Sequence, residues 1–257
     1  MSSVPAARSV PHNKWGNIMN ISTLPALAAI SVAAGLAGCL QQQSVRDAAS
    51  GCVADAAKPL HMLSIDASER LTARQQDLLK HVTTRAWGQV PPNAEFRVYV
   101  LNGRPAEVVP MLRLCRQPAL SALDGPRTRA FAEHSARQAA NDNAVAKLTE
   151  EIAAGGGIGA QAKGSRIYEH LAAVPRLGEG PYTSRHLIIF SDMIQLSPSI
   201  RTNAALPADG LNLAGHRLHV VLLGDGASLH SGWQRLLSNS GADVSVSVEG
   251  LPPELAR

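Results

Sequence analysis

Two uninterrupted apolar runs in the second half of the chain constrain the fold most strongly. Residues 185–192 read RHLIIFSD and residues 217–224 read RLHVVLLG. Short apolar runs without internal Gly or Pro are typical of strands that are buried on both faces. Such strands belong to largely parallel sheets whose two faces are covered by helices. The sequence therefore predicts an α/β protein, and its 257 residues, 45% of them hydrophobic, suffice for one sizeable domain.

The rest of the chain alternates between strand and helix patterns. Further strands are predicted at residues 60–66, 95–102 and 244–248, and helices at residues 72–88, 125–153, 165–174 and 228–239. Asn102-Gly103 is a turn signal, so residues 107–116 are predicted to pair with the preceding strand. We therefore expect a mostly parallel central sheet with one antiparallel edge strand and helices on both faces.

Residues 1–38 have the pattern of a targeting segment. Arg8 and Lys14 precede an uncharged apolar run over residues 21–37. These two residues account for two of the four net positive charges of the whole chain. The remaining charge is small and dispersed, so charge alone does not indicate a nucleic-acid-binding protein.

The tetrad Leu36-Ala37-Gly38-Cys39 closes the apolar run and resembles the lipobox of bacterial lipoproteins. The resemblance implies acylation of Cys39, cleavage just before it, and anchoring in the cell envelope. Residue 40 is Leu, not Asp, which in that family resembles proteins sent to the outer membrane, facing the periplasm. Two alternatives stay open: an ordinary membrane anchor with a chance Cys, and a start at Met19.

Residues 39–58 are polar and rich in Ala, and we interpret them as a lipidated flexible tether. If Cys39 is lipidated, Cys52 and Cys115 remain, and an even number of Cys in an oxidising compartment predicts a Cys52–Cys115 disulfide. A closed loop of about 63 residues would stabilise the fold by about 4 kcal/mol in the chain-entropy description. The alternative is two unpaired thiols.

Two carboxylates mark the candidate site. Asp66 and Asp192 each follow a predicted central strand, and ligands of open α/β sheets bind beyond the carboxyl ends of the strands. Oxygen ligands from separate loops suit a hard divalent cation such as Mg²⁺. The alternative is purely structural, with both carboxylates capping loops and accepting from each other's backbone.

The order of elements and these loops resemble the von Willebrand factor type A domain over residues 59–257. That family's metal-ion-dependent adhesion site begins with an Asp-x-Ser-x-Ser loop, which falls here on Asp66-Ala67-Ser68-Glu69-Arg70. The resemblance implies metal ligands at Asp66, Ser68, Ser165 and Asp192. Arg70 stands where the family has a second Ser, so the site is degenerate, and a cationic guanidinium nearby would oppose a second cation.

Other motifs do not hold. Residues 159–165 look like a phosphate-binding loop, but Arg166 stands where Ser or Thr is needed and a helix precedes the loop, so no nucleotide is expected. Ser228, in a partial nucleophile-elbow pattern, is better explained as a helix N-cap. His216 and His219 are three apart on a strand and face opposite ways.

The sequence thus predicts a membrane-anchored, non-enzymatic envelope lipoprotein. Its von Willebrand type A-like domain would bind an envelope protein, with Mg²⁺ as a candidate cofactor and Arg70 as a candidate acceptor of a partner carboxylate. One alternative is an envelope hydrolase that uses Asp66, Asp192 and a His. Another is an accessory component of a secretion or conjugation assembly.

Overall fold

The computed structural model describes residues 46–47, 50–53, 56–101, 109–120, 125–126, 128–155, 164–224, 228–248 and 250–251. The chain divides into two units, residues 1–43 and 44–257, and the described residues all belong to the second. The predicted signal peptide, Cys39 and the Asn102-Gly103 turn lie outside the described residues. Within the described part, no helix has the length and apolar character needed to cross a membrane.

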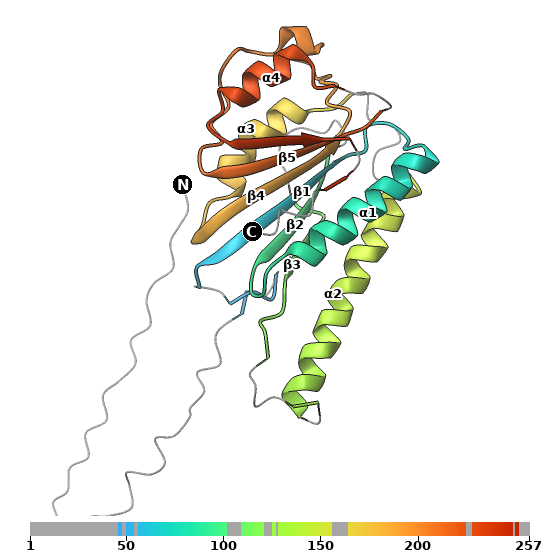
Figure 1. Cartoon of the computed structure of the whole chain (residues 1–257), viewed down its shortest axis with the longest axis vertical. Coiled ribbons are helices and arrows are strands. Elements are labelled where there is room, and N and C mark those ends of the chain that lie inside the picture. Colours follow the sequence, from blue (N-terminus) through green and yellow to red (C-terminus); the bar gives the residue numbers. More distant parts are fainter. Residues whose placement is uncertain are drawn as a thin grey trace, which may run out of the picture. The chain divides into compact units, whose positions relative to one another are not determined.

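Six strands form one sheet in the order β3-β2-β1-β4-β5-β6 (Figure 1). All neighbouring pairs are parallel except β2 and β3, which are antiparallel. The strands are β1 (Lys58–Asp66), β2 (Glu95–Leu101), β3 (Leu112–Cys115), β4 (Tyr182–Ser191), β5 (His216–Leu222) and β6 (Asp243–Ser247). The helices are α1 (Ala73–Gln89), α2 (Arg129–Ala153), α3 (Ile167–Leu177), α4 (Ser231–Ser238) and the short 3₁₀ helix η1 (Asn203–Ala205).

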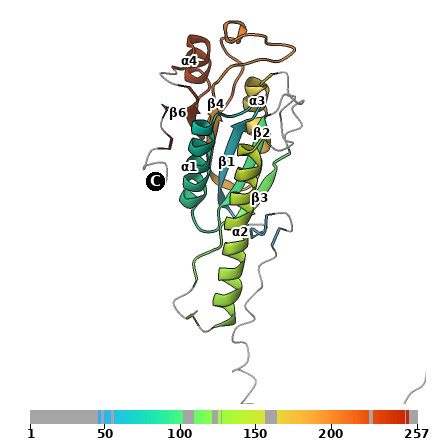
Figure 2. The ribbon, with the colours of Figure 1, turned by 90° about the vertical axis from the view of Figure 1, so that its right-hand side faces the viewer.

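Helices cover both faces of the sheet, as Figures 1 and 2 show. Side chains alternate along each strand, so Leu63 and Ile65 of β1 pack with α1 and α2, whereas Leu60 and Met62 pack with α3 and α4. The two apolar layers explain why the central strands read as continuous apolar runs. The predicted fold class, with its antiparallel edge strand, is confirmed.

Local signals in the sequence explain where two of the helices begin. Thr72 accepts from the amide of Gln75, and the Gln75 side chain accepts from the amide of Thr72, so a capping box is present at the start of α1. The prediction for α4 was wrong by two residues. Its N-cap is His230, whose Nδ1 accepts from Gly232, and not Ser228, because the histidine ring supplies the same acceptor nearer the helix.

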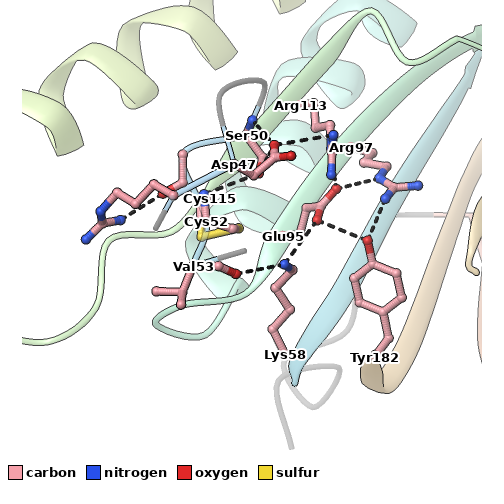
Figure 3. Close-up of polar contacts among 12 residues, drawn as sticks. Asp47, Ser50, Cys52, Val53, Lys58, Glu95, Arg97, Arg113, Cys115 and Tyr182 are labelled. Carbon is pink, nitrogen blue, oxygen red and sulfur yellow. Dashed lines mark hydrogen bonds and ion pairs between the residues drawn. A yellow bond between two sulfur atoms is a disulfide. The ribbon is translucent and has the colours of Figure 1, made fainter. Parts of the chain in front are cut away.

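The disulfide between Cys52 and Cys115 is confirmed, with a Cα–Cα distance of 5.0 Å (Figure 3). Both cysteines are fully buried. Asp47 also forms an ion pair of 3.4 Å with Arg113 of β3. Residues 46–47 and 50–53 of the predicted tether are therefore folded against the sheet, and β1 begins at Lys58, two residues earlier than predicted. The folded unit starts earlier than composition suggested because a disulfide and an ion pair replace the missing apolar contacts.

Candidate functional site

The candidate site lies where the order of the strands reverses. The chain runs from β1 to β2 on one side and returns to β4 on the other, so the carboxyl ends of β1 and β4 adjoin. Asp66 is the last residue of β1, Ser191 is the last residue of β4, and Ser165 precedes α3. This reversal point is where open α/β sheets bind ligands.

Asp66 is the centre of the site. Its Oδ2 accepts hydrogen bonds from the hydroxyls of Ser165, at 2.7 Å, and Ser191, at 2.8 Å. Its Oδ1 accepts from the backbone amide of Ser68 at 3.1 Å. All three partners come from different segments, so a single buried carboxylate holds the loop after β1, the end of β4 and the start of α3 together.

Asp192 lies beside this centre and differs from it in environment. Its Oδ1 accepts from the amide of Ile194 at 2.8 Å, within its own loop. Burial, followed by repulsion from the carboxylates of Asp66 and Glu69, raises the pKa of Asp192, although its hydrogen bonds act in the opposite direction. Asp192 is thus close enough to Asp66 and Glu69 for their negative charges to oppose one another.

The structure brings some of the residues predicted for the metal site into contact with one another. Asp66 and Ser165 are in direct contact, and Asp192 interacts electrostatically with Asp66. Ser68 reaches Asp66 through its backbone amide. Arg70 is exposed, and no hydrogen bond or ion pair joins it to any other described residue.

These side chains fit a hard divalent cation such as Mg²⁺. Ser165 and Ser191 donate their protons to Asp66, which leaves hydroxyl lone pairs to face a cation. The repulsion that raises the pKa of Asp192 is what a cation would relieve. Asp66, Ser165, Ser191 and Asp192 would then supply the protein oxygens. Neither here nor elsewhere among the described residues are three His, Cys, Asp or Glu side chains grouped to hold a metal, so a cation at this site would depend on the serine hydroxyls as well as the two carboxylates.

Ser191 is the site residue that sequence reasoning missed. It stands between Phe190 and Asp192, and only the carboxylate of Asp192 was predicted to belong to the site. The available signal was alternation: Leu187 and Ile189 face α3, so Ser191 continues on that face as a polar residue that is fully buried. A buried hydroxyl at a strand end needs an acceptor, and the carboxylate of Asp66 at the end of the neighbouring strand β1 supplies it.

An apolar rim adjoins these polar groups. The loop after β4 exposes Ile194 by 58% and Leu196 by 44%, whereas Gln195 between them is fully buried. The amide of Leu196 donates to the carbonyl of Ser165 at 2.9 Å. Gly164, with φ of +132°, lies so close to the Leu196 carbonyl that a Cβ there would stand 2.3 Å from that oxygen. The loop is therefore fixed to the same residue that donates to Asp66.

A Ser–His pair lies between strand β1 and helix α3. Ser64 Oγ and His170 Nε2 are 2.6 Å apart, and both residues are almost fully buried. Burial lowers the pKa of His170 to about 4. With no route from solvent to the hydroxyl, this pair has the environment of a structural contact. A separate cavity of about 200 Å³ is lined by Thr72, Arg74, Gln75, Leu78, Leu222, Leu223, Gly224 and Val248, none of them a residue of the site.

No family model matches the sequence, and no curated protein matches it. Among solved structures, the chain is similar to "von Willebrand factor type A from Catenulispora acidiphila" at 14% identity and a TM-score of 0.42. The similarity covers 75% of this chain and 39% of that chain. The fold class stands on the strand order and directions given above.

Proposed function

We propose that this protein is a bacterial envelope lipoprotein, anchored through lipid on Cys39, whose α/β domain binds another envelope protein at the Asp66 site. The outer membrane, with the domain facing the periplasm, is the proposed location. The observation that carries the proposal is the cluster in which Ser165 and Ser191 donate hydrogen bonds to Asp66. The exposed apolar side chains of Ile194 and Leu196 lie in the adjoining loop. Protein-binding surfaces combine an apolar centre with polar groups at its edge, and Ile194 and Leu196 would supply the apolar part next to the polar Asp66 site.

The position of the folded tether segment supports this arrangement. Cys52 is bonded to Cys115, whose partner in the sheet is Glu95, the first residue of β2. This is the end of the sheet where the parallel strands begin. The eight residue steps from Lys58 to Asp66 span about 26 Å of strand. A lipid on Cys39 would thus hold one end of the domain and leave the site at the other end, accessible to a partner.

Arg70 and Mg²⁺ have distinct proposed roles. Mg²⁺ would bind the oxygens of Asp66, Ser165, Ser191 and Asp192, with Ser68 at the loop. The exposed guanidinium of Arg70 would donate hydrogen bonds to a carboxylate of the partner, because a bidentate Arg–carboxylate pair is among the stronger polar contacts. Neither role requires chemistry on the partner.

Site-specific photo-crosslinking tests the interaction in the producing cell. A photoreactive amino acid at Ile194 should yield one adduct with an envelope protein, and the same amino acid at exposed Ala136 on α2 should not. Arg70→Glu should abolish the adduct at Ile194, since the substitution reverses an exposed charge without removing a buried contact. An adduct that persists in Arg70→Glu would contradict the role of Arg70. The absence of any adduct that is specific to Ile194 would contradict a protein-binding function at this end of the sheet.

A further inference from the structure

The two edges of the sheet are protected to different degrees. On β3, Arg113 lies in an ion pair with Asp47, and the carbonyl of Cys115 accepts from the side chain of Asn141 on α2. The disulfide also attaches the segment around Cys52 to this strand. Charged side chains and covering segments are the usual means by which proteins prevent an edge strand from pairing.

The opposite edge, β6, has no disulfide, ion pair or covering segment in the part of the chain that the structure describes, and its one charged side chain is Asp243 at its start. It pairs with β5 along one side and with no described strand along the other. Residues 243–248 read DVSVSV, without Lys, Arg or Pro. Figure 2 shows β6 at the margin of the sheet. Val246 of β6 and Val248 just after it are each 44% exposed, and an exposed apolar edge strand is a site where another chain can pair.

β6 is also held firmly in register. On one face, His219 of β5 binds both of its neighbouring serines, with Nδ1 2.7 Å from Ser245 Oγ and Nε2 2.8 Å from Ser247 Oγ. After β6 the chain turns away from the edge, since Leu251 is buried in the layer formed with α1 and α2. The backbone N–H and C=O groups on the outer side of β6 are therefore held in strand geometry by its pairing with β5.

We propose that β6 pairs antiparallel with β6 of a second copy of this chain, so that two six-stranded sheets become one. The strand is complementary to itself. Because valines alternate with serines, an antiparallel register centred on Ser245 places Val244 opposite Val246 of the second copy. The same register places Asp243 opposite Ser247 of the second copy, so no like charges meet. The inference is independent of the Asp66 site.

A strand of five residues buries little area, so pairing between freely diffusing copies would be weak. Attachment of both copies to one membrane raises their effective concentration without any new contact. The dimer is therefore expected in the membrane-bound, full-length chain.

Cysteine scanning of the full-length chain in its membrane tests the proposal. Single cysteines are placed in turn at Val244, Ser245, Val246 and Ser247, with Ala136→Cys on exposed α2 as the control, and a mild copper oxidant is added. One scanned position should give a disulfide-linked dimer on a non-reducing gel, and its neighbours should give much less, because one register brings only one residue opposite itself. Adding Val246→Lys to the best variant should remove the dimer, whereas circular dichroism should remain that of the wild type.

Three outcomes would overturn the proposal. They are dimer levels no higher than those of Ala136→Cys, a dimer that persists in Val246→Lys, and a cross-linked product whose mass shows a different protein as the partner. The membrane part of the argument rests on the proposed lipid anchor, so the same scan is also made on purified chain at high concentration, where the pairing itself is tested without the anchor.

Discussion

Asp66 illustrates how one side chain can serve both structure and binding. It accepts three hydrogen bonds, two from hydroxyls and one from an amide, and these donors replace the water that a carboxylate needs when it is buried. Ser191 Oγ also accepts from the amide of Met193 at 2.8 Å, and under the proposed function the remaining lone pairs of the two hydroxyls would face Mg²⁺. Asp192 accepts fewer hydrogen bonds than Asp66. Burial, and then repulsion from Asp66 and Glu69, makes its ionised form less favourable and raises its pKa.

The first prediction concerns Mg²⁺ and Arg70. Titration calorimetry of metal-free protein should show Mg²⁺ binding that is lost in Asp192→Ala, because that variant removes a carboxylate ligand. Arg70→Ser should bind Mg²⁺ more tightly than the wild type, since it removes a cation and restores a hydroxyl to the loop. Equal heats in the wild type and Asp192→Ala would rule out a cation at this position.

The second prediction concerns acid sensitivity and His170. Burial lowers the pKa of His170 from 6.5 to about 4. Between these two values the unfolded chain binds a proton that the folded chain does not, so stability falls as the pH drops below 6.5. At pH 5 the loss from His170 alone is about 2 kcal/mol. Urea unfolding at pH 7 and pH 5 should therefore show a smaller pH effect in His170→Gln than in the wild type.

His61 serves as the internal comparison for this experiment. Burial, and then the charge of neighbouring His186, lowers the pKa of His61 to about 3, so it acts in the same direction. Because His61 remains in the His170→Gln variant, acid sensitivity should decrease but not vanish. If the wild type and the variant lose equal stability between pH 7 and pH 5, the buried neutral His170 is not the source.

At the scale of elements, Glu95 joins four strands at the end of the sheet opposite to Asp66 (Figure 3). Its fully buried carboxylate accepts from Arg97 at 2.7 Å, Arg113 at 2.5 Å and the Tyr182 hydroxyl at 3.0 Å, and lies 3.9 Å from Lys58. Burial acts to raise the pKa of Glu95, but the hydrogen bonds from Arg113 and Arg97 outweigh it, and the pKa is lowered.

The third prediction follows from this network. Glu95→Gln leaves buried cations without their counter-charge, and such losses destabilise proteins by about 3 kcal/mol or more. Chemical denaturation should therefore show a large decrease in the free energy of unfolding. The matched control is Glu133→Gln on α2, which removes an exposed ion pair with Arg129 and should leave stability unchanged. Similar effects of the two substitutions would contradict a structural role for the buried network.

The elements also show what the sequence could and could not predict. The central strands were predictable because apolar runs determine burial on both faces, and α1 because its capping box is local. In α2, the first large apolar residue on the helix is Phe131 near its start, but burial begins only at Val145, since the N-terminal half of the helix runs past the end of the sheet (Figure 1). Helical spacing indicates which face is apolar, but not whether another element lies opposite it.

The site was predictable to a similar extent. Asp66 and Asp192 follow from their positions at strand ends, and the direct contact of Ser165 with Asp66 agrees with its predicted place. Ser191 and the Glu95 network were not predicted. Both depend on which strands are neighbours, and the sequence alone does not specify strand order. Tertiary contacts of this kind become visible only when residues far apart in the chain are placed side by side.

At the scale of the whole molecule, the fourth prediction concerns the anchor. The disulfide and the ion pair of Asp47 with Arg113 fix the chain at the end of the sheet opposite to the Asp66 site. If lipid is attached to Cys39, only six residues separate it from Arg46, where the described structure begins, so about 25 Å of extended chain is the greatest distance between them. The linker would then limit how far this end of the sheet can lie from the lipid.

Intact mass spectrometry of the membrane-extracted chain measures this directly. The expected mass is that of residues 39–257 plus acyl groups, because several chains are needed for stable anchoring. Cys39→Ser should leave the chain without acyl groups, whereas Cys52→Ser should affect the disulfide but not the lipid. A wild-type chain that retains residues 1–38 would refute lipidation at Cys39, and with it the attachment of the domain to a membrane through this residue.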